Sequence, residues 1–363
     1  MKNGVWQKSL KDSIINAEEL SQYLDLTVEE IGWFASQNDE EYLRFQIPKE
    51  YLSLIDPKAS REDPIRVQAI PIADEFTSLG CETSDPLAEL QYQLTPRLVR
   101  RYKSRAVFLA TDRCAMYCRH CFRRRFTGKM NGAATKAEIE EAATRIAMIP
   151  EIKELLISGG DPLLMTDHQL QQMISIFQDT SPELVIRIGT RIPVVLPSRV
   201  TDELLEILYQ ANRRAPIYIM VQFNHPRELD MASRAALLEL SDRGIPLFNQ
   251  AVLLRGVNDC VEVLEELMNS LVRNRVKPYY LFQGDLASGT SHLRVPLKRG
   301  FQIEQELRRR LSGLAMPVYA VDLPHGGGKI PLVGNSLIKV EEDHYLFKNM
   351  DGDELWYVDV EDY

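Results

Sequence analysis

Short apolar runs alternate with amphipathic segments through the middle of the chain. The apolar runs have the length and β-branched composition of buried strands, and the amphipathic segments repeat apolar residues with the period of an α-helix. Such strand–helix units imply parallel strand pairing with right-handed crossovers. The expected strands cover residues 106–111, 154–158, 184–190, 217–223, 245–254 and 279–285, and the expected helices cover 134–149, 166–179, 201–212 and 261–274.

Six units of this kind are fewer than the eight of a closed barrel. The pattern predicts an α/β fold in which residues 101–331 form a partial, open parallel β/α barrel of about six strand–helix units. Residues 1–100 carry helical signals and then a loop-rich stretch, which predicts an N-terminal helical layer with a connecting arm. Within that layer, Thr27 stands three residues before Glu30, which is the spacing of a capping box.

The final segment, residues 332–363, has a different pattern from the barrel. Two runs of alternating apolar and polar residues flank Asp351 and Gly352, and an Asp-Gly pair between such runs is a hairpin signal. We expect a short C-terminal β hairpin extension that covers an edge of the barrel sheet and carries no chemistry.

Composition narrows the class of protein. With 45% apolar and 26% charged residues among 363, the chain has the balance of a globular protein with a sizeable core. The net charge of -9 argues against broad affinity for nucleic acid, which needs an excess of Lys and Arg. The N-terminus lacks a signal-peptide core and no segment approaches about eighteen unbroken apolar residues, so we expect a cytoplasmic protein without a membrane span.

Basic residues nevertheless gather on both sides of three closely spaced cysteines. Because fixed guanidinium groups suit phosphate and carboxylate geometry, we expect this cluster to bind small anionic ligands. The alternative is a solvated basic surface. The cluster comprises Arg100, Arg101, Lys103, Arg105, Arg119, Arg123, Arg124 and Arg125.

The three cysteines are Cys114, Cys118 and Cys121, and they directly follow an expected strand. In a parallel α/β fold, ligands gather at the carboxyl ends of the strands. Three thiolates in so short a loop fit three corners of a cubane iron–sulfur cluster, which leaves one iron without a protein ligand. A four-cysteine zinc site usually needs two separated pairs, and five cysteines, an odd number, do not make a disulfide framework.

A second candidate site is the run His325-Gly-Gly-Gly-Lys329. A phosphate-binding P-loop is excluded, because Ile330 stands where Ser or Thr should bind magnesium and Pro331 stands where a helix should start. A lysine on a flexible glycine arm can instead reach into a pocket and form a Schiff base with an aldehyde cofactor. A solvated turn is the alternative.

The cysteine spacing, with Tyr117 before the middle cysteine, resembles the signature of the radical S-adenosylmethionine (SAM) superfamily. From about Tyr51 to Pro331, further motifs resemble the lysine 2,3-aminomutase family in order. The resemblance implies that the open iron binds the amino and carboxylate groups of SAM, and that reductive cleavage yields methionine and a 5′-deoxyadenosyl radical. The motifs are DRCAMYCRHCFRRRF, LLISGGDPLL, RIGTRIPVVLP, FNHPRE, NQAVLLRGVNDC, PYYLFQGDLASGTSH and VDLPHGGGKIP.

The same resemblance implies an isomerase that moves the α-amino group of L-lysine to the β-carbon. It implies a [4Fe-4S] cluster, SAM, pyridoxal 5′-phosphate (PLP), an external reductant such as flavodoxin or ferredoxin, and a homo-oligomer. The implied residues are Lys329 for PLP; Arg101, Tyr102 and Arg105, assisted by Arg191, for its phosphate; Ser158, Gly159, Gly160, Asp161 and Gln250 for SAM; and Arg123, Asp285 and Asp322 for the substrate.

The paired acids bear on the choice of substrate. Two carboxylates at neighbouring strand ends repel each other unless a cation lies between them or one takes up a proton, and the ε-ammonium of lysine would provide that cation. In the resembling family, glutamate-acting relatives have non-acidic residues at these two positions. Keeping both Asp285 and Asp322 therefore favours lysine over glutamate.

The chain departs from the family pattern at several positions. Phe282 replaces a common tyrosine, Gln222 a common histidine and Gly284 a common cysteine, and His325 interrupts a glycine run. These differences leave another cationic amino acid such as arginine open as the substrate. Longer members bind zinc with a cysteine matching Cys260 and later cysteines, and because no cysteine follows Cys260 here, we expect no zinc.

Two further alternatives concern the protein's role. A shorter relative that lacks this zinc makes β-lysine for elongation factor P. The non-enzyme alternative is an iron–sulfur electron carrier or sensor that binds a protein partner.

Overall fold

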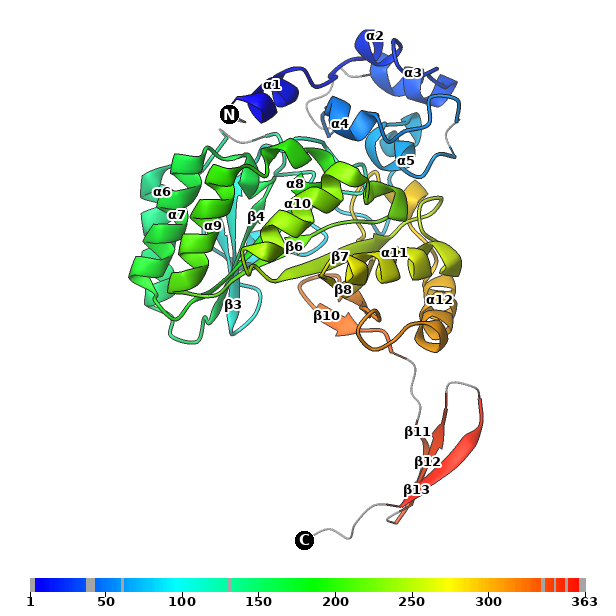
Figure 1. Cartoon of the computed structure of the whole chain (residues 1–363). Coiled ribbons are helices and arrows are strands. Elements are labelled where there is room, and N and C mark those ends of the chain that lie inside the picture. The colour runs from blue at the N-terminus through cyan, green and yellow to red at the C-terminus, as the bar shows by residue number, and fades with distance from the viewer. Residues whose placement is uncertain are drawn as a thin grey trace.

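A computed structural model describes residues 4–36, 43–59, 62–129, 132–333, 337–342, 344–349 and 352–358. Its central feature is a ten-stranded sheet whose strands follow one another in chain order (Figure 1). The strands are β1 (Gln93–Thr95), β2 (Leu98–Val99), β3 (Arg105–Thr111), β4 (Glu154–Gly159), β5 (Val185–Thr190), β6 (Ile217–Val221), β7 (Leu247–Leu253), β8 (Val276–Gln283), β9 (Val318–Leu323) and β10 (Gly328–Pro331).

Strands β3 to β9 pair in parallel, and the antiparallel strands β1, β2 and β10 extend the sheet at its two ends. Because β1 and β10 are the two ends of the strand order, the sheet does not close on itself. The predicted α/β fold with an open parallel barrel is confirmed.

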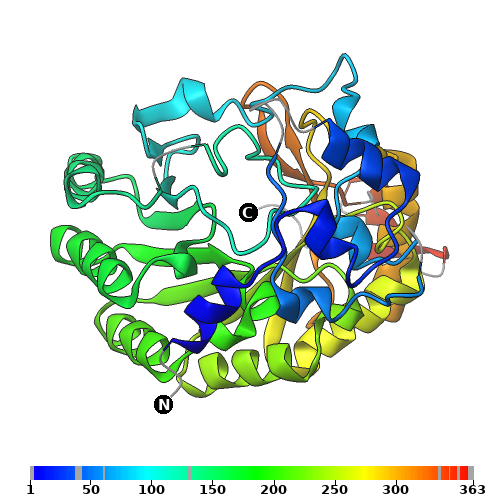
Figure 2. The ribbon, with the colours of Figure 1, turned by 90° about the horizontal axis from the view of Figure 1, so that it is seen from above.

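Six helices provide the parallel crossovers and lie outside the strands around most of the circumference (Figure 2). Capping boxes at Thr135 and Thr166 begin two of them, as the local sequence requires. Six strand–helix units are therefore confirmed, with β9 as a seventh parallel strand. The helices are α6 (Lys136–Ala147), α7 (Asp167–Thr180), α9 (Asp202–Arg214), α10 (Met231–Asp242), α11 (Val261–Arg273) and α12 (Leu297–Arg310).

The helical pattern had not predicted α10 or α12. Gly300, inside α12, weakens the intrinsic preference for a helix. The structure explains this residue by packing, because a Cβ at Gly300 would collide with the phenol of Tyr319. The Tyr319 hydroxyl in turn donates to Gln283 Oε1 on β8 at 2.7 Å.

The N-terminal layer contains short helices that lie above the barrel in Figure 1. The predicted capping box between Thr27 and Glu30 is present. Glu30 also forms a buried ion pair with Arg66 at 2.7 Å, which joins two helices of the layer. The helices are α1 (Val5–Lys11), α2 (Ala17–Leu20), α3 (Val28–Ala35), α4 (Lys49–Leu52) and α5 (Arg66–Ala69).

The C-terminal extension is a separate three-stranded antiparallel sheet of β11 (Leu337–Glu341), β12 (His344–Lys348) and β13 (Glu354–Val358). The predicted hairpin corresponds to β12 and β13, although Asp351 of its turn lies outside the described residues. The expectation that this extension covers the barrel edge is wrong. Its strands pair only with one another among the described residues, and the sheet projects away from the barrel (Figure 1).

No helix within the described residues has both the length and the apolar character needed to cross a membrane.

Candidate active site

A cavity of about 340 Å³ opens at the carboxyl ends of the parallel strands. All sixteen site residues predicted from the sequence line it, from strands and loops that are far apart in the chain. The cavity therefore brings together the three cysteines, the Ser158–Asp161 turn, Arg101, Tyr102, Arg105, Arg123, Arg191, Gln250, Asp285, Asp322 and Lys329.

The cysteine loop is held against the end of β4 by a very close backbone approach. The Asp161 amide donates to Arg113 O at 2.8 Å. A Cβ on Gly159 would overlap Thr111 O, and a Cβ on Gly160 would overlap Arg113 O. The two glycines, which the resemblance assigns to SAM, are thus already required by contact between two parts of the chain.

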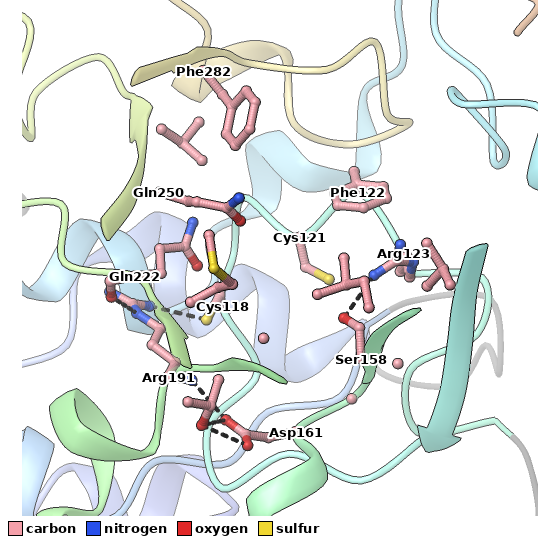
Figure 3. Close-up of a pocket in the computed structure, with 18 of the residues that line it drawn as sticks. Cys118, Cys121, Phe122, Arg123, Ser158, Asp161, Arg191, Gln222, Gln250 and Phe282 are labelled. Carbon is pink, nitrogen blue, oxygen red and sulfur yellow. Dashed lines mark hydrogen bonds between the residues drawn. The ribbon is translucent and has the colours of Figure 1, made fainter. Parts of the chain in front are cut away.

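Asp161 is buried, and donors from the chain occupy its carboxylate (Figure 3). The Thr190 hydroxyl donates to both oxygens at 2.8 and 2.9 Å, and the Arg191 amide donates to Oδ2 at 2.7 Å. Burial nevertheless raises the pKa of Asp161 to about 6, against the opposing effect of these bonds. Asp161 therefore fixes the start of the segment that carries Arg191.

Arg191 lies at the cysteine end of the cavity, where Nη1 donates to Cys118 Sγ at 2.9 Å (Figure 3). Its Nη2 donates to Gln68 at 2.6 Å and to the buried carboxylate of Glu228 at 2.5 Å. The expected contact of Arg191 with the PLP phosphate stays a prediction, because these contacts place its guanidinium at the cysteine end of the cavity. Its guanidinium is held by a buried acid and directed at a cysteine sulfur.

The arginines next to the cysteines have carboxylate partners within the chain. Glu75, from the connecting arm, is buried and binds Arg119 at 2.6 Å and also Arg124. These two guanidinium groups hold the pKa of Glu75 below its usual value despite its burial. The prediction of a cluster devoted to small anions is therefore wrong for Arg119 and Arg124.

Arg123 is placed between two protein groups. Its Nη2 binds Glu89 Oε1 at 2.8 Å, and its Nη1 donates to Ser158 Oγ at 3.0 Å (Figure 3). Arg125 also lies near this acid and pairs with Asp85 at 3.2 Å. Glu89 therefore orients Arg123 toward the cavity before any ligand arrives.

Lys329 lies on a β hairpin and not on a flexible glycine arm. Strand β10 pairs with β9 so that Lys329 is directly opposite Asp322. The connecting turn needs left-handed backbone at His325, Gly326 and Gly328, with φ values of 56°, 77° and 82°. The Lys329 amide donates to the Tyr102 hydroxyl at 2.9 Å, which ties this edge to the loop before β3. Glycine supplies the turn, and the strand register aims the lysine.

The ammonium of Lys329 lies over aromatic rings and near an acid. Its Nζ is 3.9 Å from the Phe282 ring centre, 4.5 Å from the Tyr280 ring centre and 3.8 Å from Asp322 Oδ2. Burial lowers the pKa of Lys329 to about 8, although Asp322 and Asp285 act in the opposite direction. A lysine of this kind spends part of its time as a neutral amine near pH 8, which is the nucleophilic form.

The two acids have unequal environments. Asp322 forms an ion pair with Arg101 at 3.0 Å. The pKa of Asp285 is raised to about 7, chiefly by burial and secondly by repulsion from Asp322. Of the two ways expected to relieve this repulsion, a cation or a bound proton, the structure supplies cations of its own in Arg101 and Lys329, which the sequence argument did not include.

The thiols at one end of the cavity and the basic residues at its other end suit an iron–sulfur cluster with SAM and PLP, respectively. Three thiols face one end, and the half-buried imidazole of His120 lines the same cavity. The described residues include no group of three His, Cys, Asp or Glu side chains that could hold a single metal ion. Cluster ligands need not converge on one ion, because each thiolate binds a different iron. At the other end, Arg105 stacks on the Tyr102 ring at 3.8 Å, beside Lys329.

Sequence reasoning missed several residues of this cavity. Glu89 and Arg187 line it, as does His120, which stands inside the cysteine motif. The position of His120 between two cysteines was a usable signal, whereas Glu89 lies in a loop-rich arm with no local pattern. Of the departures from the family pattern, Phe282 and Gln222 line the cavity.

Comparison with known proteins agrees with this geometry. The family model "Radical SAM superfamily" matches residues 108–269, and the model "Lysine-2,3-aminomutase" matches residues 303–363. L-lysine 2,3-aminomutase from Clostridium subterminale is 42% identical over 96% of this chain and 82% of its own length. The chain belongs to the lysine 2,3-aminomutase family. This membership makes it a radical SAM isomerase of the aminomutase type and removes support from the non-enzyme alternative.

Other relatives widen the picture of this aminomutase. Glutamate 2,3-aminomutase from Clostridioides difficile is 37% identical over 96% of this chain and 81% of its own length. A solved radical SAM methyltransferase from Sphaerobacter thermophilus has a TM-score of 0.46 and 18% identity over 62% of this chain and 68% of its own, which supports no further argument. The radical SAM superfamily uses a [4Fe-4S] cluster and SAM, and lysine 2,3-aminomutases are PLP-dependent.

Proposed function

We propose that this aminomutase converts L-lysine to β-lysine by moving the α-amino group to the β-carbon. The observation that supports the proposal is one cavity with three cysteines at one end and Lys329, Asp285 and Asp322 at the other. A radical source and an amine-binding site thus share one enclosed space, which is what a 1,2 amino shift needs.

At the cysteine end, Cys114, Cys118 and Cys121 would hold the cluster, and Gln250 with the Ser158–Asp161 turn would bind SAM. Bound there, the cluster and SAM supply the radical that removes hydrogen from the substrate. Arg191 is assigned to this end, where its Nη1 donates to Cys118 Sγ and would stabilise a thiolate that binds the cluster.

At the other end, Lys329 would hold PLP through a Schiff base, and Arg101, Tyr102 and Arg105 would bind its phosphate. A phosphate on Arg101 competes with the Arg101–Asp322 ion pair and frees Asp322 for a substrate ammonium. Arg123, oriented by Glu89, would bind the substrate carboxylate through its guanidinium.

Lysine is favoured over glutamate because the far end of the cavity is acidic. Deprotonated Asp285 and Asp322 stabilise an ε-ammonium and repel a second carboxylate. Arginine is the second candidate, since its guanidinium would satisfy the same two acids, and Phe282 and Gln222 change the wall of the cavity relative to the family pattern.

The decisive experiment is anaerobic incubation of the cluster-loaded protein with SAM, PLP, a reductant and one amino acid at a time. We expect β-lysine from L-lysine and little product from L-arginine or L-glutamate, with the enantiomer identified by chiral chromatography. Cleavage of SAM without β-lysine would contradict the substrate, and a β-amino acid from arginine would establish the second candidate.

The cellular setting is part of the proposal. We propose a cytoplasmic enzyme that receives electrons from flavodoxin or ferredoxin, with supply of β-lysine for elongation factor P as an alternative role. A homo-oligomer is supported by the C-terminal sheet, on which Ile338, Val340, Leu355 and Trp356 are about half exposed. Light scattering of the intact protein tests this, and a monomer at all concentrations would exclude it.

A further inference from the structure

A second hollow lies on the other side of the cysteine loop from the cavity described above. It has a volume of about 560 Å³ and is more polar than the main cavity. Four basic residues from four separate segments line it, namely Lys11, Arg44, Arg113 and Lys129. Cys114 lines both this hollow and the main cavity, so this cysteine forms part of the wall between them.

The basic side chains lie at the surface. Lys11, Arg44, Arg113 and Lys129 are all exposed, whereas Asp112, the acid that lines the hollow, is buried. The four basic residues come from α1, the segment before α4, the cysteine loop and the loop before α6. The hollow is therefore a concentrated positive surface on a chain whose net charge is -9.

Two of the basic side chains lie against the backbone of the loop before α6. Arg44 packs against the backbone at Gly128, and Arg113 packs against the backbone at Gly132. Tyr117 also lines the hollow, three residues after Cys114. The backbone of Arg44 is fixed from below, because its carbonyl accepts from Arg119 Nη1 at 2.8 Å.

We propose that this hollow is the docking site for the acidic one-electron carrier protein that reduces the cluster, with Cys114 as the point of electron entry. The inference rests on the proposed function, because it assumes a cluster on the three cysteines. Surface charge of opposite sign steers and orients such a partner and can raise association rates by 10 to 10³-fold. The main cavity cannot serve this purpose while it holds SAM and substrate away from solvent.

The step itself is a single electron transfer. The reduced carrier loses one electron and the [4Fe-4S] cluster gains it, passing from the 2+ to the 1+ state. No atom is exchanged, and no proton needs to enter the main cavity.

The test compares two double charge-reversal variants of the full-length, cluster-loaded protein. One carries Lys11→Glu and Arg44→Glu in the hollow, and the matched control carries Arg255→Glu and Lys298→Glu, which are exposed residues elsewhere. Cluster reduction is followed by electron paramagnetic resonance and by visible absorbance, with reduced flavodoxin as the carrier. We expect the hollow variant to be reduced at least tenfold more slowly at low ionic strength, and the control at the wild-type rate.

Two further measurements separate the possible outcomes. High salt should lower the rate at which flavodoxin reduces the wild-type cluster toward the rate of the hollow variant, because salt screens exposed charges. Reduced methyl viologen, a cation, should reduce the hollow variant at least as fast as the wild type, and lysine turnover driven by it should be equal in all three proteins. Equal rates with flavodoxin for the two variants would overturn the docking site.

The same design distinguishes this inference from the proposed function. Charge-dependent cluster reduction without any β-lysine would leave the docking site in place and contradict the lysine reaction. If all three proteins convert lysine with methyl viologen and flavodoxin reduces them at equal rates, the lysine reaction stands and the docking site is contradicted.

Discussion

The cysteine end and the lysine end of the cavity differ in how far the chain satisfies its own polar groups. At the cysteine end, Asp161 and Arg191 are each bound by several buried partners. At the lysine end, Asp285 has a pKa raised to about 7 and Lys329 one lowered to about 8, because burial opposes their charges. The polar groups of the cysteine end are already oriented by the protein. At the lysine end, buried charges are destabilised, and a charged ligand can stabilise them.

The largest expected effect separates the two ends by removing one lysine. Lys329→Ala should lower β-lysine formation at least about 10³-fold, since PLP would no longer be held in place. The visible absorbance of bound PLP should disappear while the cluster absorbance persists. Lys298→Ala, at an exposed lysine outside the cavity, is the control and should retain both. Retention of activity in Lys329→Ala would contradict the proposal that this lysine holds PLP.

The cysteine end should be the more sensitive in stability. Glu75→Gln leaves Arg119 and Arg124 without their shared buried carboxylate and should lower the free energy of unfolding by about 3 kcal/mol. Anaerobic denaturant titration measures this change. Glu206→Gln, which removes a surface partner of Arg243, should change the free energy by less than about 1 kcal/mol. Equal effects of the two substitutions would mean that the buried ion pairs of Glu75 do not contribute to stability.

The lysine end should be the more sensitive to pH. Asp285 is protonated in the folded protein below about pH 7, so its attraction for the lysine ammonium should strengthen as pH rises from about 6 to 8. The KM for lysine should fall over this range. Asp285→Asn should raise the KM about tenfold at pH 8, through loss of a charged hydrogen bond, and should flatten the dependence. An unchanged pH profile in this variant would exclude Asp285 as its source.

The raised pKa of Asp285 has the opposite consequence for folding. The folded state binds this proton more tightly than the unfolded state, whose Asp titrates near its usual value. The stability contributed by the protonated carboxyl is complete below about pH 4 and is lost as pH rises through about 7. Ligand affinity and intrinsic stability therefore change in opposite directions with pH at this residue.

The smallest effect concerns the tuning of the cluster. Arg191→Lys keeps a positive charge for Glu228 but cannot reproduce the guanidinium contacts to both Glu228 and Cys118. Loss of the N–H···S bond should make the cluster harder to reduce. We expect roughly tenfold less reduced cluster at a fixed potential, which for one electron corresponds to about 59 mV. Redox titration followed by electron paramagnetic resonance measures the midpoint potential, and an unchanged midpoint would show that Arg191 does not tune the cluster.

The sequence was sufficient for features that depend on neighbouring residues. The strands β3 to β8 and the cysteine loop could be located because apolar runs and close cysteine spacing are local signals. Strands β9 and β10 could not, because β10 is only four residues long and the glycines between the two strands resemble a loop. Their hairpin appears only once Lys329 is paired with Asp322.

The ion pairs of the site were beyond sequence reasoning for a different reason. Glu75 and Arg119 are 44 positions apart, and Glu89 and Arg123 are 34 apart. No periodic pattern connects such positions, since the fold alone brings the arm against the cysteine loop. The basic residues were therefore visible as a cluster, while the acids that neutralise them were not.

The position of β10 at the end of the sheet has one more consequence. Because β9 is its single neighbour among the described strands, the register of this pair decides which way Lys329 faces. Side chains alternate between the two faces of a strand, so a slip of one residue would turn Lys329 to the outside. The length of the turn at Gly326 thus sets the register of the two strands. Inserting or deleting a single residue there would give a protein that folds but no longer presents Lys329 to the cavity, and that is therefore inactive.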